Sequence, residues 1–109
     1  MQSQWDKAIG EFEVALGKEP NNSEYLRGLG WAIHRTGDKA KGLAYLHRAI
    51  DLAPTNVNIL TDLAAAYLSD FQFYKAREYA EEAIQNEPGS NVAREVLDNI
   101  ARFQRDYGG

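Results

Sequence analysis

Apolar and small residues recur along this chain at intervals of three and four positions. The first such stripe consists of Trp5, Ala8, Ile9, Phe12, Ala15 and Leu16. This spacing is that of one face of an amphipathic helix, which predicts a helix over residues 5–18. Similar stripes occupy residues 26–36, 40–52, 60–67, 74–84 and 92–107. No stretch has the pattern of a β-strand, so the sequence predicts an all-α chain of about six helices.

Residues that end or cap helices lie between these stripes. Pro20, Pro54 and Pro88 each follow one of them, and proline is disfavoured inside a helix. The polar residues 21–23 supply side-chain acceptors that can cap the second helix. Gly37 can take the left-handed conformation that ends this helix, and Asp38 can cap the third.

The same kinds of residue return with a fixed period. The three prolines are 34 residues apart. Small, apolar and basic positions share this register: Ala15, Ala49 and Ala83; Leu16, Ile50 and Ile84; Lys7, Lys41 and Lys75; Ala8, Gly42 and Ala76. This combination is typical of helical-repeat proteins, in which each repeat buries its apolar face by stacking on the next one.

With this register, residues 23–56 resemble the tetratricopeptide repeat (TPR). The matching positions are Leu26, Leu29, Gly30, Ile33, Gly37, Asp38, Ala40, Leu46, Ala49 and Pro54. Residues 57–90 match at Leu60, Leu63, Ala64, Tyr67, Ala80, Ala83 and Pro88. They have Phe71 where the turn between the two helices usually has glycine, and we expect a wider turn there.

The resemblance implies one TPR domain over residues 1–109, folded as an α-solenoid of antiparallel helix pairs with a right-handed superhelix. Residues 1–22 would be the second helix of a partial repeat, and residues 23–56 and 57–90 would be full repeats. Residues 91–109 would be the first helix of a partial repeat or a capping helix.

Composition and charge narrow the function. The net charge of −4 argues against general nucleic-acid binding. Residues 23–56 are net basic and residues 57–90 net acidic, which fits solvated helix faces or, alternatively, a groove that attracts a charged peptide. The absence of cysteine excludes disulfides, thiolate catalysis and thiolate zinc sites.

The sequence also lacks the signals of membrane insertion. Residues 1–10 are polar, without the apolar core of a signal peptide, and no apolar run approaches the roughly 18 residues of a membrane span. We expect a soluble chain. Its compartment is taken as the cytoplasm by default, because the absence of cysteine does not identify one.

TPR arrays typically bind extended peptides along the concave face formed by the first helix of each repeat. The resemblance therefore implies six candidate contacts: Arg27, Trp31, His34, Arg35, Asp62 and Leu68. Trp31 lies off the apolar stripe of its helix, and such aromatic residues are favoured anchors at interfaces. Alternatively, it packs against a neighbouring repeat. Arg27 and Arg35 flank it and can pair with carboxylates on a partner, or they are ordinary surface charges.

Some TPR domains hold the C-terminal carboxylate of chaperones in a clamp of lysine, asparagine and arginine side chains. Trp31 and Asp62 stand where this clamp has asparagines, and Val92 and Val96 replace its later cations. The clamp is therefore absent, and we do not predict a chaperone-tail adaptor.

No catalytic constellation is evident. His34 and His47 lie on successive helices without a third ligand at a metal-site spacing, so we interpret them as surface histidines. Ser23, Ser69 and Ser90 lie at helix boundaries, where capping explains them. We predict a non-catalytic scaffold with no cofactor or metal and with a protein or peptide as its partner.

The incomplete repeats suggest an alternative function. Each end would expose apolar surface that a further helix normally covers, and Val92, Val96 and Phe103 would add to it. The last helix of one molecule could then stack on the first helix of another, which would make the chain an end-to-end assembly element and a homo-oligomer. The competing interpretation is that the chain is a piece of a longer protein.

Overall fold

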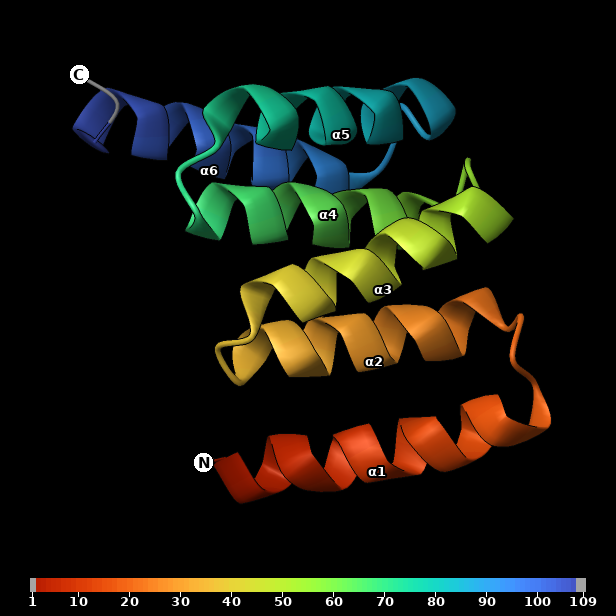
Figure 1. Cartoon of the computed structure of the whole chain (residues 1–109). Coiled ribbons are helices and arrows are strands. Elements are labelled where there is room, and N and C mark those ends of the chain that lie inside the picture. The colour runs from red at the N-terminus through yellow and green to blue at the C-terminus, as the bar shows by residue number, and fades with distance from the viewer. Residues whose placement is uncertain (1, 108–109) are drawn as a thin grey trace. The chain divides into compact units, whose positions relative to one another are not determined.

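A computed structural model describes residues 2–107 of this chain. It consists of six helices (Figure 1): α1 (Gln2–Lys18), α2 (Ser23–Arg35), α3 (Lys39–Leu52), α4 (Val57–Ser69), α5 (Phe73–Asn86) and α6 (Asn91–Tyr107). No strand occurs within the described residues. The all-α prediction and the order of the helices are confirmed, although the first helix begins before Trp5.

Capping side chains begin α2, α3, α4 and α6, and of these only Asn56 was not predicted. The side chain of Asn22 accepts a hydrogen bond from the Tyr25 amide (3.0 Å), and Asn56 accepts one from the Ile59 amide (3.1 Å). Ser90, in the same register, accepts one from the Ala93 amide (3.1 Å). Asp38 likewise caps α3 through the Lys41 amide (3.2 Å). Each cap satisfies an amide that has no partner inside its helix, which fixes where the helix starts.

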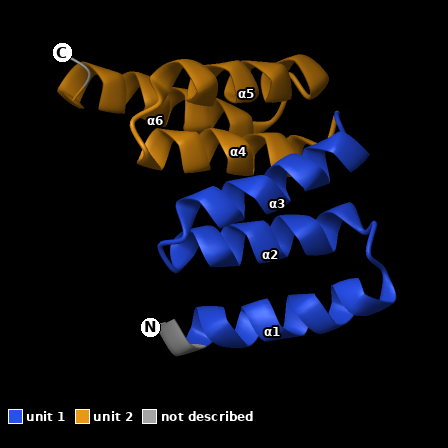
Figure 2. Ribbon diagram, in the orientation of Figure 1, with its two compact units in different colours: residues 1–54 blue, residues 55–109 orange. Residues whose placement is uncertain are grey.

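The helices form two compact units (Figure 2). Unit 1, residues 1–54, contains α1, α2 and α3, and its α2 packs against both α1 and α3. Unit 2, residues 55–109, contains α4, α5 and α6, which pack against one another in all three combinations. Each unit therefore includes one of the helix pairs that the 34-residue period predicted.

Glycines let α2 and α3 approach closely in unit 1. A Cβ atom on Gly30 would lie 2.8 Å from the Gly42 carbonyl oxygen, and one on Gly42 would lie 2.7 Å from the Gly30 carbonyl oxygen. Real Cβ atoms do not approach backbone so closely, so both positions require glycine at this helix spacing. The equivalent residues of unit 2 are Ala64 and Ala76, both buried.

The turn between α4 and α5 corrects one prediction. It comprises residues 70–72, and its counterpart between α2 and α3 comprises residues 36–38, so it is not wider. Phe71 achieves this by adopting a φ of 58°, in the left-handed region that Gly37 also enters with a φ of +107°. Its amide donates to the Leu68 carbonyl (2.9 Å), as the Gly37 amide donates to that of His34 (3.1 Å).

Candidate protein-binding surface

Three of the predicted contact residues form a row along α2. Arg27, Trp31 and Arg35 are spaced four residues apart, so their side chains follow one another at intervals of about one turn on a single helix face. Arg35 is exposed, whereas Arg27 and Trp31 are partly buried. We call this row the α2 face.

Two neighbours on the same helix hold the indole of Trp31. Its ring lies parallel to that of His34, with centroids 6.0 Å apart and an interplanar angle of 7°. The Arg35 guanidinium carbon lies 5.8 Å from the centroid of the indole, within the range of a cation–π interaction. The α2 face therefore presents a large amphipathic ring whose orientation is restrained before any partner arrives.

His34 itself does not face outward. Its side chain is only 6% exposed, and a Cβ atom on Gly42 would lie 2.7 Å from the Cβ atom of His34. The close approach of α3 thus encloses the side of α2 that carries His34. The prediction of a surface histidine is wrong at this position. His34 as a direct contact stays a prediction, and its ring lies beside that of Trp31.

The N-terminal half of the α2 face is partly occupied by the chain's own residues. Arg27 Nη1 lies 3.2 Å from Glu24 Oε2, an exposed pair that contributes little to stability. A side chain at Gly28 would collide with the ring of Phe12 from α1. The accessible part of the face is therefore centred on Trp31 and Arg35.

The two candidate contacts of unit 2 differ from each other. Asp62 on α4 is partly exposed, but Leu68 is only 8% exposed. Most of α4 is buried, including Ile59, Leu60, Leu63 and Tyr67. Leu68 lies on the buried side of this helix, whereas Asn58, Asp62 and Ala65 lie on its less buried side. Leu68 as a contact stays a prediction.

The predicted end-contact residues on α6 also differ in their exposure to solvent. Val92 is 55% exposed and Phe103 is 37% exposed, whereas Val96 is partly buried. The core side of α6 is formed by Ala93 and Ile100, both buried. Most other exposed side chains of this helix are charged, as Arg94, Asp98 and Arg102 illustrate.

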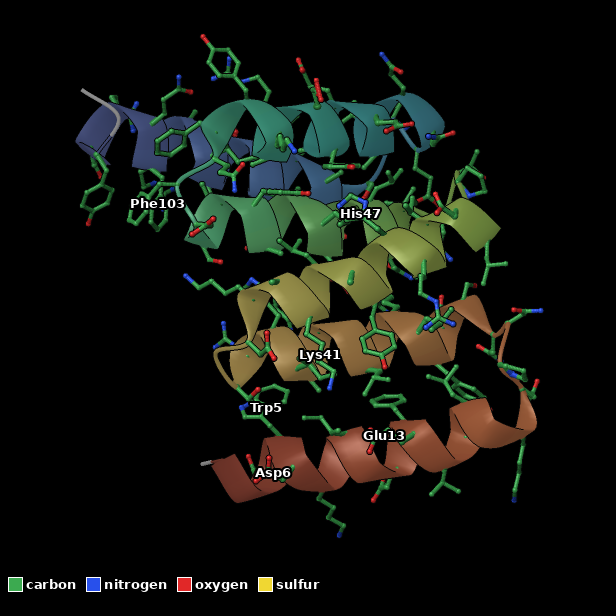
Figure 3. The ribbon with its side chains drawn as sticks, viewed as in Figure 1. Trp5, Asp6, Glu13, Lys41, His47 and Phe103 are labelled. Carbon is green, nitrogen blue, oxygen red and sulfur yellow. The ribbon has the colours of Figure 1, made fainter. Side chains whose placement is uncertain are left out.

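An aromatic cluster near the C-terminal end of α6, which includes the Phe103 labelled in Figure 3, was not predicted. Phe71 makes edge contacts with Phe73 and Tyr107, with ring centroids 6.3 and 5.9 Å apart, and Phe103 lies 5.5 Å from Tyr107. We call these four residues the aromatic cluster. Phe71, Phe73 and neighbouring side chains line an open cleft of about 420 Å³. Two features of the sequence could have indicated this cluster: the aromatic-rich run of residues 71–74, and Phe103 and Tyr107, which lie one turn apart on α6.

Within the described part of the chain, no group of three histidine, cysteine, aspartate or glutamate side chains is placed to hold a metal ion. Nor does any of the described helices have the length and apolar character that crossing a bilayer requires.

Solved structures share this arrangement of helices, although no protein-family model matches the sequence. The first TPR domain of human RPAP3 aligns with a TM-score of 0.85 at 19% identity, covering 96% of this chain and 83% of that one. The Arabidopsis OM64 TPR domain aligns with a TM-score of 0.80 at 17% identity, over 92% of this chain and 83% of that one. The chain has a TPR fold.

A third TPR structure shows one of these domains with a ligand. The first TPR of Spaghetti (RPAP3), bound to the HSP90 peptide SRMEEVD, aligns with a TM-score of 0.82 at 20% identity, over 93% of this chain and 80% of that one. The TPR fold confirms the all-α helical-repeat solenoid predicted from the 34-residue period. In TPR terms α2 and α3 form one helix pair, and α4 and α5 form the next.

Proposed function

We propose that this TPR domain is a non-catalytic interaction scaffold that binds an extended protein or peptide segment, with the α2 face as its main contact. The observation that carries the proposal is the restrained, partly exposed indole of Trp31 beside the exposed Arg35. Tryptophan and arginine are the residues most enriched among those that dominate binding energy at interfaces. The proposal is also supported by the TPR neighbours, one of which holds a peptide.

The α2 face favours a partner segment with two features. An apolar or aromatic side chain can pack on the indole, which is already oriented and so loses little conformational entropy on binding. A carboxylate near it can form charge-assisted hydrogen bonds with Arg35 or Arg27. In unit 2 we propose Asp62 as a separate contact, which favours a basic group elsewhere on the partner.

The chemistry of these positions disfavours a chaperone tail as the ligand. Trp31 and Asp62 stand where the carboxylate clamp has asparagines, and Asp62 would repel an acidic peptide end. We therefore expect the peptide SRMEEVD, found on the Spaghetti TPR, to bind this domain weakly or not at all.

The test is a selection of linear peptides from a random display library on the full chain, followed by affinity measurements. Trp31→Ala should raise the Kd of a selected peptide by at least about 30-fold, corresponding to about 2 kcal/mol. Val14→Ala, at an exposed apolar position on α1, is the matched control and should leave the Kd unchanged. Failure to select any peptide, or equal affinity of the Trp31→Ala variant, would overturn the proposal.

End-to-end assembly is the second candidate function. It is favoured by the exposure of Val92 and Phe103 on α6. The apolar stripe of α1 supports it as well, since none of its members is fully buried: Trp5, Ala8, Ile9, Phe12, Ala15 and Leu16. The charged residues on the exposed side of α6 weaken this candidate, because a second helix stacked there would have to desolvate them.

A further inference from the structure

Peptide binding through the α2 face leaves the aromatic cluster of unit 2 without a role. Phe71 is 57% exposed, Tyr107 is 66% exposed and Phe103 is 37% exposed. At about 200 Å² for a whole aromatic side chain, these three rings expose on the order of 300 Å² of apolar surface. The largest apolar patch on a typical monomer is of about this size and is often functional.

Phe71 makes the patch harder to explain as a by-product of folding. Its φ of 58° is a conformation that glycine adopts without cost and that a bulky side chain adopts rarely. Its ring is mostly exposed, so the burial of apolar surface compensates only in part for the backbone strain. Strained residues of this kind tend to persist where they serve a function.

The surroundings of the cluster carry both signs of charge. Asp70 precedes Phe71, and Lys75 lines the cleft beside it. On α6, Arg105 and Asp106 come directly before Tyr107. All four of these charged residues are exposed. Acidic and basic groups around an apolar centre permit a self-complementary contact, in which a two-fold rotation brings acid to base while the apolar centres meet.

We propose that the aromatic cluster is the contact surface for a second copy of this chain, in a two-fold symmetric dimer. The rings of each copy would pack on those of the other, with Asp70, Lys75, Arg105 and Asp106 at the rim. A stable interface buries about 800 Å² on each partner. The cluster supplies more than a third of this area as the apolar centre, and the exposed Tyr74 and the charged rim supply the remainder.

This dimer differs from end-to-end assembly in its symmetry. The same surface is used by both copies, so the contact is saturated when two molecules have met. None of the contact residues proposed for the dimer lies on α1 or on the α2 face.

The experiment is a measurement of molar mass by light scattering on the full chain, from low micromolar to millimolar concentration. The expected mass rises from 12.2 kDa to a plateau at two copies. Phe71→Gly and Tyr107→Ser should each raise the dissociation constant of the dimer by at least about tenfold. Leu52→Ser, at an exposed apolar position at the end of α3, is the matched control and should behave as the wild type.

Circular dichroism establishes that both variants remain folded, and Phe71→Gly suits the turn because glycine adopts its φ readily. A constant mass of one chain, growth beyond two copies, or a dimer that both variants leave intact would each overturn the proposal. Loss of dimerisation in these variants should not change the Kd of an α2-selected peptide. The two proposals can therefore fail separately.

Discussion

Gly37 and Phe71 hold equivalent positions after α2 and α4, and both have positive φ angles, +107° and 58°. A residue with a Cβ atom pays about 1–2 kcal/mol for the left-handed conformation, whereas glycine adopts it freely. Phe71 keeps the turn short despite this cost. The free energy of its strain can therefore be measured by substitution.

Phe71→Gly is expected to change the free energy of unfolding by less than about 1 kcal/mol, because released strain offsets lost ring contacts and the greater freedom of the unfolded chain. Phe71→Val should lower the Tm by at least about 4 °C, since a β-branched residue resists positive φ and the ring contacts are also lost. Thermal unfolding followed by circular dichroism measures both. Equal Tm values for the two variants would mean that the backbone at residue 71 is not strained.

Trp31, the proposed contact residue, lies beside a buried neighbour on the same helix. His34 is fixed where α3 crosses α2, and the indole lies parallel to its ring. The peptide-binding experiment on Trp31→Ala thus tests an arrangement that involves a buried residue as well as an exposed one.

At the scale of the helices, the main difference between the two pairs lies where they cross. Gly30 and Gly42 meet backbone to backbone in unit 1, whereas Ala64 and Ala76 occupy the same register in unit 2. A methyl group is tolerated between α4 and α5 but has no room between α2 and α3. The closer approach of α3 is also what buries His34.

Gly42→Ala should therefore destabilise the domain by roughly 1–3 kcal/mol, because its Cβ atom would lie 2.7 Å from the backbone of α2. Gly10→Ala is the matched control: it lies inside α1 with no atom within 4 Å of an added Cβ. There the gain in helix propensity should stabilise by about 0.5–1 kcal/mol. Urea unfolding measures both, and a Gly42→Ala variant as stable as the wild type would contradict the close crossing.

At the scale of the whole molecule, the two modes of self-association predict different dependences of mass on concentration. A two-fold dimer through the aromatic cluster stops at two copies, whereas stacking of α6 on α1 adds copies without limit. Repeat arrays extend in the second way, since each unit of such an array contacts only its neighbours.

Val92 separates these modes because it is exposed on α6 but is not part of the aromatic cluster. If end-to-end stacking occurs, Val92→Glu should abolish growth beyond two copies, because it places a charge in an apolar contact. It should leave a closed dimer unchanged. Light scattering at increasing concentration measures both effects, and growth that persists in the variant would exclude stacking through this residue.

The six helices were predictable because their causes are local, although α1 begins three residues before Trp5, its predicted start. A helix is marked by the three- and four-residue spacing of its apolar side chains, and its start by an acceptor such as Asn22 or Asp38. The 34-residue period added the pairing of the helices and the TPR fold, since equivalent residues of successive repeats face equivalent neighbours. Arg27, Trp31 and Arg35 shared a face for the same local reason.

Exposure and long-range contacts were decided by tertiary packing. His34 and Leu68 lie at the margin of the apolar stripes of their helices, eight residues after Leu26 and Leu60, and packing buries both. The aromatic cluster brings a turn residue, Phe71, to Tyr107 on another helix. Periodicity along one helix specifies which residues share a side, and the distance and direction of the neighbouring helices decide whether that side meets water or protein.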